Sequence, residues 1–192
     1  MSLVHRLRTA LAQAPVLPPL ESLDKIAFEA SVPAAVMIAV TDRPQPGDIL
    51  TVRRDHMRTH AGQVAFPGGR IDPGENAVQA ALREAWEEIG LDPAATEVVS
   101  EVDPYRTITG FAVTPVLAVV PPDQQLSPHE HEVADWFEAP LHFVLDPANQ
   151  ELKSALFQGR ERHYYEIVWN DRKIWGATAA MIVNLSRRLQ WS

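Results

Sequence analysis

The 192-residue sequence contains no cysteine, and this absence removes several classes of site. Disulfide bonds, thiolate metal ligands and cysteine nucleophiles are all excluded. A chain without cysteine is compatible with a reducing compartment, so we expect a cytoplasmic location.

Long hydrophobic runs and an excess of basic charge are also missing. No apolar stretch approaches the roughly 20 residues that cross a bilayer, and the longest, 113–120, is interrupted by Thr114 and Pro115 and predicts a buried strand. The formal net charge is −8, whereas nonspecific nucleic-acid binding requires a basic surface. We therefore expect neither a membrane nor a nucleic acid as a partner. If the substrate is a polyanion, something must offset the acidity of the protein.

The length and an ordinary composition predict one globular domain over residues 1–192. The first 20 residues carry two arginines and no acid, as transit peptides do, but no apolar signal core follows. We expect instead a helical extension over 1–30, in which the prolines of 15–19 separate a first helix from a second near 21–30. The apolar positions on one face of the first helix are Leu3, Val4, Leu7 and Leu11.

Alternation of strand-like and helix-like segments predicts a layered α/β domain. Strands are expected at 34–41, 49–54, 64–66, 97–102, 110–120 and 162–169. Helices are expected at 76–89, 140–145 and 176–189. The turn residues of 43–48 predict a hairpin between the first two strands. Segments 55–69 and 126–135 have the composition of loops, apart from the short strand at 64–66.

The helix expected at 76–89 has one apolar face and one acidic face. At about 100° per residue, Glu84, Glu87 and Glu88 fall on the same side, and the apolar residues fill the opposite arc. The expected caps are a capping box of Asn76 with Gln79 and a left-handed Gly90.

The three carboxylates destabilise the isolated helix. Like charges one turn apart repel, and the helix dipole disfavours acids near the C-terminal end. A divalent cation reverses this cost, because carboxylate oxygens suit Mg²⁺ or Mn²⁺, which also bind phosphates. The alternative is a solvated charged face with an ordinary Arg83–Glu87 pair. The residues before the helix favour the metal site.

Gly69 is followed after five residues by Glu75, and after seven more by the run from Arg83 to Leu91, REAWEEIGL. Segment 69–91 resembles the signature of the Nudix hydrolase family, with every fixed glycine, acid and arginine present. The resemblance implies a Nudix-type α/β/α sandwich with a mixed β-sheet. It also implies hydrolysis of a nucleoside diphosphate linked to another group.

The resemblance further implies roles for individual residues. Glu84, Glu87 and Glu88, with the backbone carbonyl of Gly69, would hold Mg²⁺ or Mn²⁺. Glu75 and Arg83 would brace the loop against the helix, a role we favour over direct catalysis by Arg83. The candidates for a general base are Glu84 itself or, from the acidic loop 127–132, Glu130 and Glu132. In the same loop, His129 and His131 fit a metal pair less well than they fit exposed loop residues.

A second resemblance lies upstream. The run 60–69, HAGQVAFPGG, together with Ile49-Leu50-Thr51 and Arg58, is similar to the coenzyme A pyrophosphatase branch of the family. That branch would produce 3′,5′-ADP and 4′-phosphopantetheine. Recognition of the 3′-phosphate needs cationic donors. The candidate donors are Arg53, Arg54, Arg58 and His60, of which Arg53 and Arg54 depart from the pattern of the branch.

Tyr105 and Phe111 either stack on the adenine or belong to the core. Two alternatives to coenzyme A hydrolysis remain open. One is a Nudix enzyme acting on ADP-ribose, NADH or a dinucleoside polyphosphate. The other is a Nudix-fold module that binds a ligand without catalysis, although such a module has no need to retain every acid of the signature. The sequence does not indicate an oligomeric state.

Overall fold

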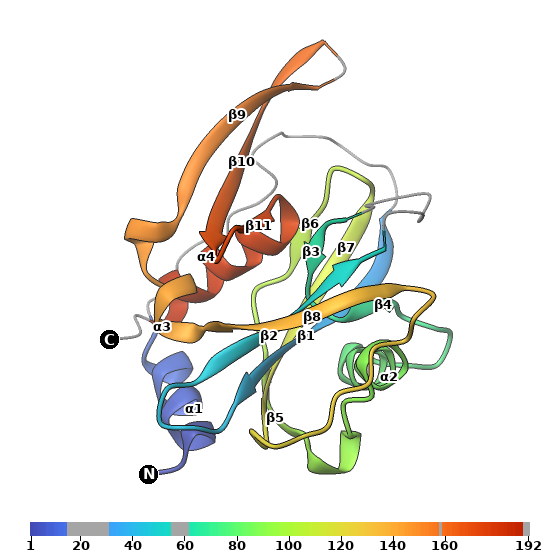
Figure 1. Ribbon diagram of the computed structural model, residues 1–192, viewed down its shortest axis with the longest axis vertical. Helices are drawn as coiled ribbons and strands as arrows, with labels where there is room; N and C mark the ends of the chain where they lie inside the picture. Colours follow the sequence, from blue (N-terminus) through green and yellow to red (C-terminus); the bar gives the residue numbers. More distant parts are fainter. Residues whose placement is uncertain (15–30, 55–61, 158, 190–192) are drawn as a thin grey trace.

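A mixed eight-stranded sheet forms the centre of the computed structural model, which describes residues 1–14, 31–54, 62–157 and 159–189 (Figure 1). The main path of the sheet runs β3 (Val64–Ala65), β2 (Gly47–Arg53), β1 (Val32–Thr41), β7 (Phe111–Val120) and β5 (Glu97–Glu101). β1 pairs in parallel with β7 and antiparallel with β2. Three further strands join at the sides: β4 (Gly68–Arg70) on β1, β6 (Tyr105–Arg106) on β7 and β8 (Val133–Pro140) on β2.

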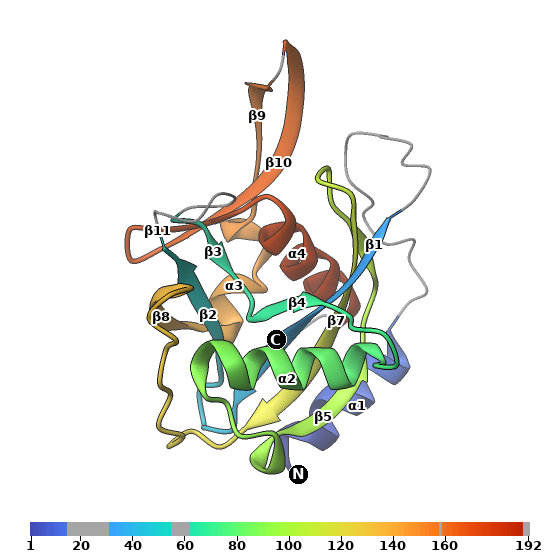
Figure 2. The same ribbon diagram turned by 90° about the vertical axis from the view of Figure 1, so that its right-hand side faces the viewer.

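Helices cover both faces of this sheet. The helix α2 (Ala77–Ile89) lies on one face, and α1 (Leu3–Gln13), α3 (Leu141–Val144) and α4 (Ala177–Leu189) lie on the other (Figures 1 and 2). β1 is therefore buried on both faces, as a central strand of a covered sheet is. Ala35, Met37 and Ala39 belong to the core under α2, whereas Ile38 and Val40 belong to the core on the opposite face. The expected α/β/α sandwich with a mixed sheet is confirmed.

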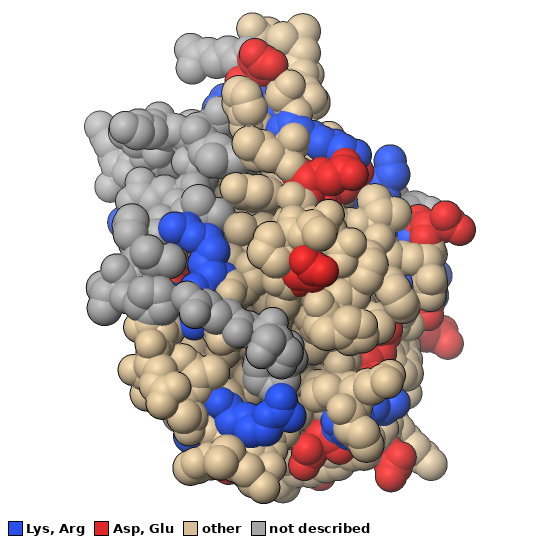
Figure 3. All heavy atoms as spheres, turned by 90° about the vertical axis from the view of Figure 1, so that its left-hand side faces the viewer, with Lys and Arg blue, Asp and Glu red and all other residues tan. Residues whose placement is uncertain are grey.

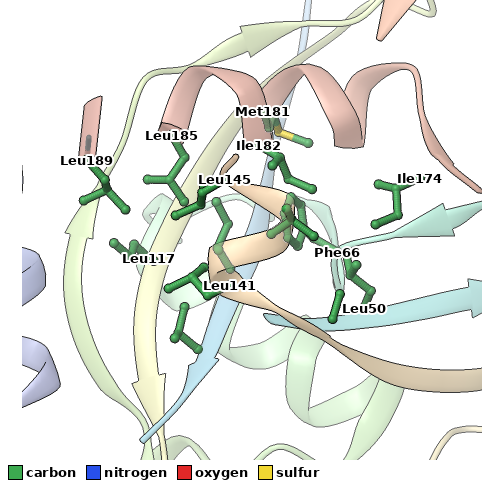
Figure 4. Close-up of a cluster of buried hydrophobic side chains, with 14 of the residues drawn as sticks. Leu50, Phe66, Leu117, Leu141, Leu145, Ile174, Met181, Ile182, Leu185 and Leu189 are labelled. Carbon is green, nitrogen blue, oxygen red and sulfur yellow. The ribbon is translucent and has the colours of Figure 1, made fainter. Parts of the chain in front are cut away.

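The larger of the two cores lies beneath α4 (Figure 4). Leu50 from β2, Leu117 from β7, Leu141 from α3 and Leu185 from α4 meet there, and each is 2% exposed or less. Burying a leucine side chain contributes roughly 1.5–3 kcal/mol. This packing fixes the sheet as a rigid base for the opposite face, where α2 lies.

A second, three-stranded sheet extends away from the main sheet. It consists of β9 (Glu151–Phe157), β10 (Arg160–Trp169) and β11 (Arg172–Trp175), and the β9–β10 hairpin projects beyond the rest of the molecule (Figures 1 and 2). Ile167 and Ile174 anchor its base in the core with no exposed surface. On the side of the molecule shown in Figure 3, basic and acidic side chains are interspersed among uncharged ones.

Most expected elements are present, and two expectations are wrong. Segment 126–135 was expected to be a loop, but β8 begins at Val133 because it pairs with β2 along its length. Segment 55–69 was expected to end as a loop, but Gly68 and Gly69 form part of β4 against β1. The links and helix expected within 15–30 lie outside the described residues. Among the described residues, no helix is long and apolar enough to cross a membrane.

Candidate active site

The helix α2 forms as its sequence predicts. The side chain of Asn76 accepts a hydrogen bond from the Gln79 backbone, Gln79 returns one to the Asn76 backbone, and Gly90 adopts the left-handed conformation at φ 70°. Ala81 and Ala85 are fully buried against the sheet. This orientation leaves the three acids at graded depths: the side chain of Glu87 is 56% exposed, that of Glu84 17% and that of Glu88 6%.

Glu88 is a buried carboxylate with two partners. Its Oε2 accepts a hydrogen bond from the Gly68 backbone N–H at 3.1 Å, and its Oε1 lies 3.8 Å from Nη1 of Arg53. Burial raises the pKa of Glu88 to about 7, and repulsion from Glu84 and Glu132 acts in the same direction, whereas Gly68 and Arg53 oppose the rise. The site therefore disfavours a negative charge on Glu88 unless a cation joins it.

Arg83 ties the loop before α2 to the acids on the helix. It donates to both carboxylate oxygens of Glu75, at 2.8 and 3.0 Å, to Glu84 at 2.7 Å and to Glu87 at 3.3 Å. A further bond of 3.0 Å reaches the backbone carbonyl of Arg70, where β4 ends. The hydrogen bonds from Arg83 and from the Asp72 backbone lower the pKa of Glu75. This geometry is that of a brace.

The acidic loop 127–132 is attached to the C-terminal end of α2. The Ser127 N–H donates to the carbonyl of Ile89 at 2.8 Å, and the His129 N–H donates to that of Glu88 at 2.7 Å. These bonds satisfy carbonyls that the end of a helix leaves without partners. On the other side, the carbonyl of Glu132 accepts from the Arg54 N–H at 3.1 Å. The loop is thus held between the helix and the end of β2.

Between the helix and this loop lies a cavity of about 350 Å³. Its lining residues are Glu84, Glu87, Glu88, His129 and Glu132. Glu130, the other candidate base, is exposed and is not among the described residues that line the cavity. A larger cavity of about 480 Å³ lies between α1, β5 and α4. Its lining includes two arginines, Arg8 and Arg188, beside the acids Glu101 and Asp103, so it lacks a comparable excess of carboxylates.

The donor set at the acidic cavity fits a hard divalent cation, because it consists of carboxylate oxygens. The backbone at Gly69 also fits: a Cβ added there would lie 2.5 Å from the carboxylate of Glu84 and would force that carboxylate to move, whereas glycine allows the close approach. Within the described residues, no three acidic or histidine side chains converge as a complete metal cluster. In this structure Arg83 contacts Glu84 and Glu87, while Arg53 and the Gly68 N–H contact Glu88.

Only some of the residues expected to contact the substrate lie beside the acidic cavity. Arg53 and Arg54 lie at the end of β2 beside Glu88 and Glu132, whereas Arg58 and His60 lie outside the described residues. Of the two alternatives for Tyr105, the structure has the core position, with 8% of the residue exposed. Phe111 is half-buried, and its ring lies 5.8 Å from the guanidinium of Arg70.

Sequence reasoning missed two contacts of this site. It gave no partner to the backbone N–H of Gly68, and it assigned Arg53 to the substrate alone rather than to Glu88. Both contacts join segments that are distant along the chain, so no local pattern could have indicated them. His129 is exposed, as expected, but it also lines the cavity.

Comparison with known proteins agrees with this geometry. The family model described as NUDIX domain matches residues 31–158. The protein named uncharacterized Nudix hydrolase NudL is 42% identical in Escherichia coli O7:K1, over 81% of this chain and 82% of the relative. The NudL of strain K12 is 41% identical over the same shares.

Two solved structures share the fold. A Nudix hydrolase from M. smegmatis, RenU, has a TM-score of 0.52 at 24% identity, over 65% of this chain and 80% of that one. The C. elegans Ap4A hydrolase, in a binary complex, has a TM-score of 0.50 at 21% identity, over 57% of this chain and 80% of that one.

Proposed function

Because this chain belongs to the Nudix hydrolase family, we propose that it hydrolyses the diphosphate bond of coenzyme A or its derivatives. The products would be 3′,5′-ADP and 4′-phosphopantetheine, or the acylated form of the latter. The observation that carries the chemistry is the cavity lined by four carboxylates and His129. A site this acidic can hold a polyanion when cations lie between its carboxylates and the phosphates of the substrate.

Glu84, Glu87 and Glu88, with the backbone of Gly69, would hold Mg²⁺ or Mn²⁺. When bound, such a cation neutralises charge on the phosphates and lowers the pKa of a coordinated water. Gly68 orients the Glu88 carboxylate through its N–H, and Arg83 orients Glu84. These contacts hold the oxygen donors in place before a ligand arrives, which is how second-layer residues tune a metal site.

The attacking water must lose a proton, and Glu132 is the acid best placed to accept it. Glu84 and Glu87 are hydrogen-bonded to Arg83, and Glu88 is buried. Glu132 lines the cavity and is exposed, and within the described part of the chain its carboxylate forms no hydrogen bond or ion pair. An unengaged carboxylate at the wall of the site suits a general base. The bond that breaks joins one phosphorus to the bridging oxygen, which leaves with the other phosphate.

Two features support coenzyme A among nucleoside diphosphates. The first is the run 60–69, which resembles the coenzyme A pyrophosphatase branch. The second is the position of Arg53 and Arg54 beside the cavity in a chain of net charge −8. Two arginines next to a diphosphate site supply donors both for the diphosphate and for a further phosphate.

The test is a substrate panel with Mg²⁺ or Mn²⁺ in ¹⁸O-labelled water, with products identified by mass spectrometry. Coenzyme A, dephospho-coenzyme A, ADP-ribose, NADH and a dinucleoside polyphosphate form the panel. We expect coenzyme A or an acyl derivative to give the highest kcat/KM, and the label to show which phosphorus is attacked. Preference for dephospho-coenzyme A or ADP-ribose would contradict the assignment to coenzyme A, and no turnover of any compound would favour a ligand-binding module.

Arg58 provides a matched test of 3′-phosphate recognition. Although Arg58 lies outside the described residues, replacing it by alanine should raise KM for coenzyme A more than for dephospho-coenzyme A, which lacks that phosphate. Equal losses on the two compounds would argue against a contact between Arg58 and the 3′-phosphate.

A further inference from the structure

Arg53 is held to Glu88 by an incomplete contact. Its Nη1 lies 3.8 Å from Oε1 of Glu88, which is longer than a hydrogen bond. The Nε of Arg53 is buried and has no hydrogen-bond partner within the described residues. An arginine that pairs with a carboxylate or phosphate frequently forms two parallel hydrogen bonds to it. Arg53 therefore serves as a counter-charge for Glu88 while part of its donor capacity stays unused.

The carboxylate of Glu88, which Arg53 contacts, is also one of the expected metal ligands. A buried carboxylate needs a cation beside it, and a divalent ion at ligand distance interacts more strongly than a guanidinium at 3.8 Å. Two cations on one carboxylate also repel each other. A metal at Glu88 thus removes the reason for Arg53 to stay there and leaves a partly buried guanidinium without its counter-ion.

We propose that Arg53 couples metal binding to diphosphate binding, by pairing with Glu88 in the metal-free protein and with a substrate phosphate once a cation occupies the acids. The inference rests on the proposed metal-dependent site. It assigns Arg53 two successive anionic partners: Glu88, which lines the acidic cavity, and then a phosphate bound in that cavity. Coupling of this kind is reciprocal, so a bound diphosphate raises metal affinity by the same factor as metal raises diphosphate affinity.

Removal of Arg53 then has two opposite effects. Arg53→Ala should bind Mn²⁺ alone more tightly than the wild type, by about fivefold, because the competing cation is gone. The same variant should gain less Mn²⁺ affinity than the wild type when a diphosphate is present, again by about fivefold. If Arg53 were purely structural, its loss would not raise the affinity for Mn²⁺ alone. Loss of packing would instead weaken Mn²⁺ binding both with and without the diphosphate.

Isothermal titration calorimetry with Mn²⁺ measures both effects, with and without α,β-methylene-ADP, which cannot be hydrolysed at the bridging position. Arg54→Ala is the matched control: it removes the same charge one residue along, and no ion pair joins the described Arg54 side chain to Glu88. Its affinity for Mn²⁺ alone should change less than twofold, which separates direct competition from long-range charge. Arg53→Lys keeps the positive charge but lacks the planar guanidinium. It should still compete with Mn²⁺ for Glu88, but it should lose part of the coupling between Mn²⁺ and diphosphate binding.

Two outcomes would overturn the inference. One is an Arg53→Ala protein with unchanged circular dichroism that binds Mn²⁺ alone no more tightly than the wild type. The other is an undiminished gain in Mn²⁺ affinity from α,β-methylene-ADP in that variant. Either result leaves the proposed hydrolysis intact, whereas a wild-type protein that binds no Mn²⁺ would remove the metal site itself.

Discussion

Both carboxylate oxygens of Glu75 accept hydrogen bonds from Arg83, at 2.8 Å from Nε and 3.0 Å from Nη2. The remaining nitrogen, Nη1, reaches Glu84 and Glu87. One guanidinium thus fixes the loop before α2 and two acids of the helix at once. Replacing either Glu75 or Arg83 should therefore weaken the same interaction.

Glu75→Gln and Arg83→Lys should each lower the melting temperature, because each loses the two-pronged contact. The double variant should melt close to the less stable single variant, since the two changes remove one shared interaction. Thermal unfolding of the wild type and the three variants measures this. Losses that simply add would show that Glu75 and Arg83 stabilise the protein independently.

Glu88→Gln should keep the fold and lower turnover at saturating Mg²⁺ by about 100-fold or more. Glutamine is neutral, suits the buried position and can still accept the hydrogen bond from the Gly68 N–H, but it is a poor ligand for a hard cation. Glu101→Gln, an exposed site on β5, is the control for the same chemical change. Wild-type turnover in the Glu88 variant would refute the metal site.

The part of this site that sequence could predict is the part encoded locally. The 3.6-residue period of α2 places three acids on one side, and its caps are readable from Asn76 and Gly90. The buried runs of β1 and β7 are equally clear. These elements are predictable because neighbouring residues along the chain determine them.

The rest depends on pairing between distant segments. β8 has a mixed sequence with acids at 135 and 138, and it is a strand because β2 pairs with it. β9 contains good helix formers such as Glu151 and Leu152, yet it is a strand that pairs with β10. The contact between Arg53 and Glu88 is of the same kind, since it joins the end of β2 to a helix that is distant along the chain.

Asp48 should make the stability of the protein fall as the pH rises. It is 1% exposed, and its Oδ1 has no hydrogen-bond partner within the described residues. Burial, with repulsion from Glu138, raises its pKa well above the usual value. The folded protein thus keeps a proton that the unfolded chain releases above about pH 4, so stability declines from there until the pKa of the folded state is reached.

Asp48→Asn should remove this contribution, because the amide does not ionise. Relative to the wild type, the variant should gain stability as the pH is raised from 4 towards 8, and its own stability should depend less on pH. Urea unfolding at several pH values measures the difference. Asp42→Asn, an exposed position close by, should leave the wild-type dependence unchanged. Parallel curves for the wild type and the Asp48 variant would contradict the raised pKa.

Glu132 and Glu130 provide the sharpest test of the general base, because they lie two residues apart and only Glu132 lines the cavity. Glu132→Gln should lower kcat by about 100-fold with little change in KM, since a base acts on the water rather than on substrate binding. Glu130→Gln should behave like the wild type in both respects. If instead Glu132→Gln retains kcat, the proton must go to another acid. Glu84 then becomes the base to test, by asking whether Glu84→Gln loses kcat while still binding Mn²⁺.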